Sequence, residues 1–216
     1  MATQTAALIV TGAWAILLVL YVVNRFGLKD RLAGGSPVIQ ISSEPYPDKK
    51  PGTFFSRLGV LFVFIVNILS LALVIGAALS PALEDWLSAW KVHFPLWLNW
   101  LGGILFVLYS IWGFLVLVYN PGYTPLTNNM QRKFILAVNG PYRLVRHPRY
   151  AAECFLNLAL FLFTGIGLPL LGILGWPAVY NQARLEEASL LEITRDLYAG
   201  YRQKTGMFLP RLPGKK

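Results

Sequence analysis

The sequence has little charge and few of the residue types that build metal or redox sites. Of its 216 residues, 13% are charged and 56% are hydrophobic. It contains two histidines and one cysteine, Cys154, so an internal disulfide and a cysteine-rich metal site are excluded and we expect no metal. We interpret Cys154 as a small apolar residue in a helix. The composition is too apolar for a soluble domain of this size.

Charge is absent altogether from three long blocks of the chain. Residues 6–23, 58–83 and 94–131 contain no Asp, Glu, Lys or Arg. Each block is long enough for a helix that crosses a bilayer, which needs roughly 17–25 residues. The sequence therefore predicts an integral membrane protein. No positive charge precedes the first block, so we expect a retained helix rather than a signal peptide.

The net charge of +9 is distributed unevenly. Six Lys or Arg lie in residues 25–57, five in residues 132–149 and seven from Arg184 onward, whereas the 80–96 loop carries one. Basic residues favour the cytoplasmic side of a membrane. We therefore expect these three basic regions and the C-terminus to be cytoplasmic, with the N-terminus and the 80–96 loop outside. The membrane accounts for the basic residues, so we expect no nucleic-acid partner.

We interpret the chain as a single all-α membrane domain, residues 1–216, in which glycine and proline separate the helices. Residues 1–119 hold three spans and a connector over 34–53, and residues 120–216 hold a polar connection, a helical hairpin and a C-terminal helix. About five spans are expected, over 6–25, 54–80, 96–119, 150–164 and 168–192. The last helix should continue out of the membrane as a polar helix containing Arg184, Glu186 and Glu187, and complete a cytoplasmic pocket. We interpret GIGLPLLG, residues 165–172, as a turn rather than a nucleotide loop, since no strand precedes it.

The stretch NGPYRLVRHPRYAAE, residues 139–153, concentrates polar chemistry beside an apolar segment. Its arginines, Arg143, Arg146 and Arg149, recur every three residues, so they would share one face of a helix. One interpretation is an anchor on anionic lipid headgroups. The other is a ligand site, because Pro148 suits a first helical turn and places His147 near the N-cap, where backbone N–H groups attract anions. Arg146 could then clamp a carboxylate or phosphate.

A second polar stretch is ARLEEASLLEITRDLYAGYRQKTGMFLPRL, residues 183–212. It can be interpreted as an amphipathic surface helix with an Arg184–Glu187 pair. A carboxylate one turn beyond an apolar span, such as Glu186, could equally hold an ammonium or sulfonium group. Together the two stretches suit a zwitterionic cofactor with an adenosyl-like ring, and the apolar spans could admit a lipidic substrate.

The same two stretches resemble motifs of a known family. LAVNGPYRLVRHPRYAA resembles the LVxxGxYxxxRHPxYxG signature of isoprenylcysteine carboxyl methyltransferases and related membrane phospholipid methyltransferases. EEASLLEITRDLYAGYRQKTG…PRL resembles their second motif, which combines a Glu-Glu pair, YxxY and a proline-containing end. The resemblance covers about residues 120–212, and the two motifs are fairly specific when they occur in this order.

The resemblance implies S-adenosylmethionine (SAM) bound on the cytoplasmic side and a lipidic or small apolar methyl acceptor. It implies a catalytic role for Arg146 and Glu187, and substrate contacts for Gln182 and Arg184. We expect no obligate protein partner beyond the lipid bilayer. The cofactor contacts that it implies are the backbone of Phe134, Ile135, Leu136 and Ala137, then Tyr142, His147, Pro148, Arg149, Tyr150, Glu186 and Tyr198.

The sequence departs from the family pattern at three positions, and two alternatives stay open. Phe134 replaces a histidine, Ala152 replaces a glycine, and Gln182 replaces an arginine that orients the substrate carboxylate, so SAM binding is better supported than carboxyl methylation. Membrane sterol reductases, which bind NADPH, share an RHPxYxGE-like sequence that Glu153 fits. A Glu-Glu pair suits an ammonium better than a phosphate, which favours SAM. The other alternative is a non-catalytic lipid-binding membrane protein.

Overall fold

The computed structural model describes residues 3–23, 39–41, 52–120, 134–194 and 196–211. Helices dominate these residues, as expected, and the two short strands pair with each other. The elements in chain order are α1 (Thr3–Val23), β1 (Ile39–Ile41), α3 (Phe54–Leu79), α4 (Pro81–Ser88), α5 (Leu96–Tyr119), β2 (Phe134–Leu136), α6 (Pro141–Leu144), α7 (Pro148–Thr164), the 3-10 helix η2 (Leu168–Gly175), α8 (Trp176–Thr194) and α9 (Asp196–Lys204). The expected connectors over 34–53 and 120–149 lie partly outside the described residues.

Three of the described helices, α1, α3 and α5, are long and apolar enough to cross a membrane. Their most apolar windows have mean hydropathies of 2.5, 2.9 and 2.3. They coincide with the first three expected spans to within three residues at each end. Helix α7 has 17 residues, which is at the lower limit of the length that a full crossing needs. The five-span topology and the side of each terminus stay predictions.

Local capping signals set the bounds of α3 and α4. Thr53 and Ser56 form a capping box, in which each side chain accepts a hydrogen bond from the other's backbone N–H. Ser80 ends α3 and caps α4, and Pro81 occupies the first turn of α4. The 80–96 segment, expected to be a loop, is therefore about half helical.

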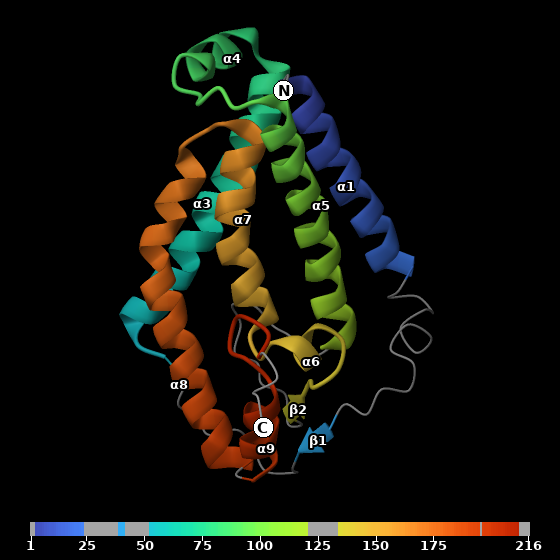
Figure 1. The fold of residues 1–216 in the computed structure, drawn as a ribbon, viewed down its shortest axis with the longest axis vertical. Coiled ribbons are helices and arrows are strands. Elements are labelled where there is room, and N and C mark those ends of the chain that lie inside the picture. Colours follow the sequence, from blue (N-terminus) through green and yellow to red (C-terminus); the bar gives the residue numbers. More distant parts are fainter. Residues whose placement is uncertain (1–2, 24–38, 42–51, 121–133, 195, 212–216) are drawn as a thin grey trace.

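Helix α7 lies at the centre of the bundle, between α5 on one side and α3 and α8 on the other (Figure 1). The backbones of α5 and α7 meet at Gly102, where a Cβ would overlap the backbone of Phe163. Gly59 of α3 lies equally close to Ala178 of α8. Such small residues let membrane helices approach each other. One end of the bundle carries α4 and the start of α1, and the other carries β1, β2 and α9 (Figure 1).

The chain between α7 and α8 differs from the expected single helix over 168–192. Gly165, with φ of 72°, ends α7 in the left-handed conformation. Residues 168–175 then form η2 rather than α-helix, because proline and glycine repeatedly interrupt the segment. The regular α-helix begins only at Trp176.

The C-terminal region folds as two helices rather than one amphipathic surface helix. Leu190 and Leu191 of α8 pack with Tyr198 and Tyr201 of α9 around Leu136. The apolar face expected to lie on the membrane therefore forms a small core around β2. Strand β2 pairs antiparallel with β1, with Ile39 opposite Leu136.

Candidate functional site

The start of α7 has the cap geometry that the sequence predicts. The three nearby arginines, however, do not share one face of a helix. His147 is the N-cap residue and Pro148 opens the helix. Helix α6 ends at Leu144, and Val145 is extended, with φ of −140° and ψ of 148°. Because no continuous helix joins the three arginines, they diverge: Arg143 is exposed, while Arg146 and Arg149 join two separate clusters. The prediction that the three arginines share one helical face is therefore wrong.

The C-terminal segment lies along this cap. Val145 and Gly206 form a parallel bridge, the Arg146 N–H donates to the Gly206 carbonyl at 2.9 Å, and the His147 N–H donates to the Met207 carbonyl at 3.0 Å. These bonds place the ring of Phe208 with its centroid 5.9 Å from that of His147. Residues 206–208 are therefore part of the site although they lie about 60 positions away in sequence.

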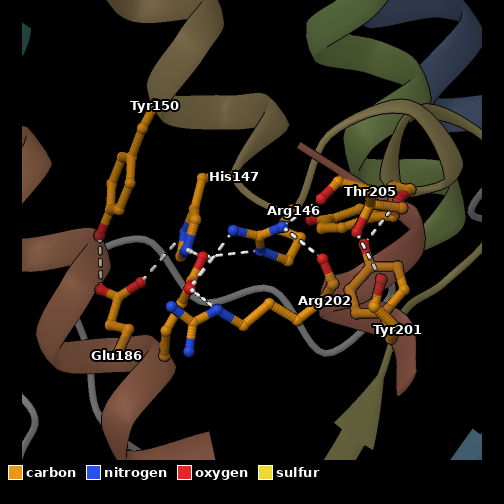
Figure 2. A network of polar contacts seen from close by, with 9 residues as sticks. Arg146, His147, Tyr150, Glu186, Tyr201, Arg202 and Thr205 are labelled. Carbon is orange, nitrogen blue, oxygen red and sulfur yellow. Dashed lines mark hydrogen bonds and ion pairs between the residues drawn. The ribbon is translucent and has the colours of Figure 1, made fainter. Parts of the chain in front are cut away.

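Glu187 is the centre of the first cluster, and its partners Arg146, His147 and Arg202 are labelled in Figure 2. Its Oε1 lies 2.7 Å from Arg146 Nε and 3.3 Å from His147 Nε2, and its Oε2 lies 3.5 Å from Arg202 Nε. Arg146 also donates to the backbone carbonyls of Arg202 and Thr205. Burial raises the pKa of the Glu187 carboxyl, but the contacts with His147 and Arg146 outweigh it and hold this pKa below its ordinary value. The two residues expected to be catalytic thus bind each other and join α7, α8, α9 and the tail.

Glu186 has a different environment. Its Oε1 accepts hydrogen bonds from the Tyr150 hydroxyl at 2.7 Å and from Gln182 Nε2 at 2.9 Å, and its Oε2 lies 3.6 Å from His147 Nδ1. Its side chain is 27% exposed, against 4% for Glu187. Among the described residues, no Lys or Arg forms an ion pair with Glu186. This carboxylate is therefore both partly accessible and not neutralised by a permanent cation from that part of the chain.

The structure separates the two residues expected to contact the acceptor. Gln182 is buried; its Oε1 accepts from Ser56 Oγ at 2.7 Å while its Nε2 donates to Glu186. It therefore lies on the side expected to hold the cofactor. Arg184 is exposed, with its guanidinium 6.0 Å from the centroid of the Tyr180 ring. It does not form the ion pair with Glu187 that its spacing suggested, because Glu187 binds Arg146 and Arg202 instead.

Several of the other expected cofactor residues lie in packing positions. Tyr142 is buried and its hydroxyl accepts from Asn120 Nδ2 at 3.1 Å, and burial raises the pKa of Tyr142 to about 12. Tyr198 is enclosed with Leu136 in the core around β2. Ala137 is buried beside Tyr142, and the backbone of Phe134 and Ile135 pairs with β1. The side chains of Phe134 and Ile135 lie outside the described residues.

Arg149 belongs to a second polar cluster. Its Nη2 lies 2.7 Å from Oε1 of Glu153, which also accepts from the Tyr109 hydroxyl at 2.8 Å. Oε2 of Glu153 accepts from Asn67 Nδ2 at 3.0 Å. Glu153, the residue that suggested the reductases, is thus buried between α3, α5 and α7 and bound by protein groups.

Two further side chains extend this second cluster towards α8. Asn157 Nδ2 donates to Asn67 Oδ1 at 2.7 Å, and Trp176 Nε1 donates to Asn157 Oδ1 at 3.0 Å. Asn67, Tyr109 and Asn157 were not predicted as members of a polar cluster. The two asparagines carried a signal, since a lone asparagine inside an apolar run has to find a polar partner when the run is buried.

A comparison with protein-family models found no matching family, and a search of curated proteins found no match either.

Proposed function

We propose that this chain is a membrane-embedded, SAM-dependent methyltransferase that acts on a lipidic or small apolar acceptor, as its two motifs suggest. The observation that carries the proposal is the environment of Glu186. Its carboxylate is 27% exposed, is held by Tyr150 and Gln182, and lies beside the His147 ring at the start of α7. The two motifs that resemble the methyltransferases, distant in sequence, meet at this carboxylate.

The residues present suit the methionine part of SAM. A partly exposed carboxylate without an Arg or Lys partner among the described residues can pair with an ammonium group. Helix α7 begins at the same place, and the partial positive charge of a helix N-terminus favours a carboxylate. An ammonium and a carboxylate on one ligand would therefore find complementary groups within one turn of His147.

Methyl transfer to a carboxylate or thiolate needs alignment and a dry site more than proton transfer. SAM, when bound, supplies the electrophilic methyl group. The chain's own contribution is to orient the donor and exclude water. Arg146 and Glu187 are nearly enclosed and bind each other at 2.7 Å, so we assign them a positioning role in holding α7, α8 and the tail together.

The topology that fits this function has five spans, with α7 as the fourth and η2 with the apolar first half of α8 as the fifth. The N-terminus would lie outside and the C-terminus in the cytoplasm. The Glu186 cluster lies at the end of the bundle that carries β2 and α9, opposite α4 (Figures 1 and 2). That end also carries the basic C-terminal helix, so SAM would bind on the cytoplasmic side.

The proposal is tested by transfer of an isotopically labelled methyl group from SAM into a membrane lipid extract. We expect Glu186→Ala to lower transfer at subsaturating SAM by about 10- to 100-fold, since a hydrogen bond to a charged group is worth about 1.5–3 kcal/mol. Glu192→Ala, which removes an exposed carboxylate from the same helix, should leave transfer unchanged. Equal effects of the two substitutions would refute the assignment of Glu186.

A further inference from the structure

A row of aromatic rings leads away from Glu186. The rings of Tyr150 and His147 stack with centroids 5.7 Å apart and an interplanar angle of 8°. The Phe208 centroid is 5.9 Å from that of His147, and the Tyr180 centroid is 6.3 Å from that of Phe208. The four rings come from α7, its cap, the C-terminal segment and α8.

This aromatic row borders the partly exposed carboxylate. The Tyr150 hydroxyl donates to Glu186 Oε1, and the imidazole of His147 faces Oε2 (Figure 2). Backbone bonds from Arg146 and His147 to residues 206 and 207 hold Phe208 in the row. Aromatic faces next to a carboxylate are the combination that binds sulfonium and quaternary ammonium groups.

The outer end of the row already binds a cation. The guanidinium of Arg184 lies 6.0 Å from the centroid of the Tyr180 ring. Arg184 is exposed and permanently charged, so it repels a second cation from the Tyr180 end of the row. A second cation would bind better towards the Tyr150 end, where Glu186 supplies a negative charge.

We propose that Phe208, with Glu186, recognises the positive charge on the sulfur of the methyl donor and thereby distinguishes donor from product. This inference rests on the proposed function. Methyl transfer breaks the S–CH3 bond, forms a bond between that carbon and the acceptor, and leaves the electron pair on sulfur, so the product is a neutral thioether. A cation–π contact is then lost, and the site binds the product more weakly than the donor by roughly 2- to 30-fold.

The test is calorimetric binding of SAM and of S-adenosylhomocysteine, its thioether product, to the detergent-purified full chain. Wild type should prefer SAM. Phe208→Leu should reduce SAM affinity by roughly 2- to 30-fold and leave the affinity for the thioether unchanged, whereas Phe208→Tyr, which keeps the ring, should keep the preference. Phe208→Met, which keeps an apolar side chain but removes the aromatic ring, serves as the second variant if Phe208→Leu does not fold. Phe55→Leu, at an exposed aromatic outside the row, is the matched control.

The outcomes separate this inference from the proposed function. Equal binding of SAM and the thioether by wild type would overturn the inference and leave SAM binding intact. An equal loss of both ligands in Phe208→Leu would show that the ring only packs, and would overturn the inference as well. Absence of any SAM binding by the folded wild-type chain would overturn the proposed function, and the inference with it.

Discussion

Replacing Glu153 by glutamine should destabilise the helix bundle, because it turns an acceptor into a donor inside a network whose direction is fixed. The indole N–H of Trp176 can only donate, so it fixes Oδ1 of Asn157 as its acceptor. Asn157 Nδ2 must then donate to Asn67 Oδ1, which leaves Asn67 Nδ2 to donate to Glu153 Oε2. The other oxygen of Glu153 already accepts two bonds, from Tyr109 and Arg149.

The structure sets the size of the effect. A glutamine at position 153 would keep its oxygen towards Arg149 and direct its amide N–H groups at Asn67 Nδ2. A buried donor left without an acceptor costs about 1–3 kcal/mol. Loss of the negative charge beside Arg149 adds less than the roughly 3–5 kcal/mol of a fully buried broken pair, because the Arg149 side chain is 24% exposed. We therefore expect Glu153→Gln to lower the free energy of unfolding by about 2–4 kcal/mol.

A second substitution should rescue the first. Asn67→Asp alone places two carboxylates together and should also destabilise the bundle. In the double variant, the carboxylate introduced at position 67 would accept from both the glutamine at position 153 and Asn157. This restores the two side-chain contacts and the total charge, but not the bond that Asn67 Nδ2 donates to the backbone carbonyl of Glu153. The assay is unfolding in detergent micelles followed by circular dichroism, with Glu192→Gln as an exposed control. We expect the double variant to recover at least half of the summed losses; strictly additive losses would refute the fixed direction of the network.

Three other predictions concern the site and the topology. Gln182→Arg places a permanent cation beside Glu186 and should weaken SAM binding about tenfold, which calorimetry measures; unchanged affinity would show that residue 182 faces the acceptor instead. Burial raises the pKa of Glu187, but its contacts with His147 and Arg146 outweigh burial and hold this pKa below its ordinary value of about 4.5. Its ionised form therefore stabilises the protein above about pH 4.5, and that stabilisation is lost on further acidification. Glu187→Gln should flatten the fall in melting temperature on acidification; parallel curves would contradict this. In a cysteine-free background, Ser88→Cys and Gln203→Cys should react with a membrane-impermeant maleimide from opposite sides of the membrane. Reaction of both from the same side would refute the expected external 80–96 segment and cytoplasmic C-terminus.

The elements that the sequence predicts correctly depend on local signals. The long uncharged runs define α1, α3 and α5, and the ends of α3 and α5 follow from Ser80, Pro95 and Asn120, which cannot continue an apolar helix well. The cap at His147 follows in the same way from Pro148. Each of these signals acts within one or two turns, so a single sequence contains it in full.

The parts that were missed depend on contacts across long stretches of sequence. The spacing of Arg146 and Arg149 assumes an unbroken helix, but the pairing of Val145 with Gly206 keeps that backbone extended and sends the two side chains apart. Gln182 meets Ser56 across 126 positions. No periodicity in either segment indicates such a contact, because it depends on how α3 and α8 pack.

The most direct test of the central claim is equilibrium binding of SAM to the detergent-purified protein, with NADPH titrated in parallel. We expect saturable binding of SAM that Glu186→Ala reduces by about 10- to 100-fold, and no saturable binding of NADPH. Binding of NADPH in place of SAM would contradict the account and favour a reductase. Binding of neither ligand would contradict it too, and would leave the Arg146–Glu187 and Glu186 contacts as structural features of a lipid-binding protein.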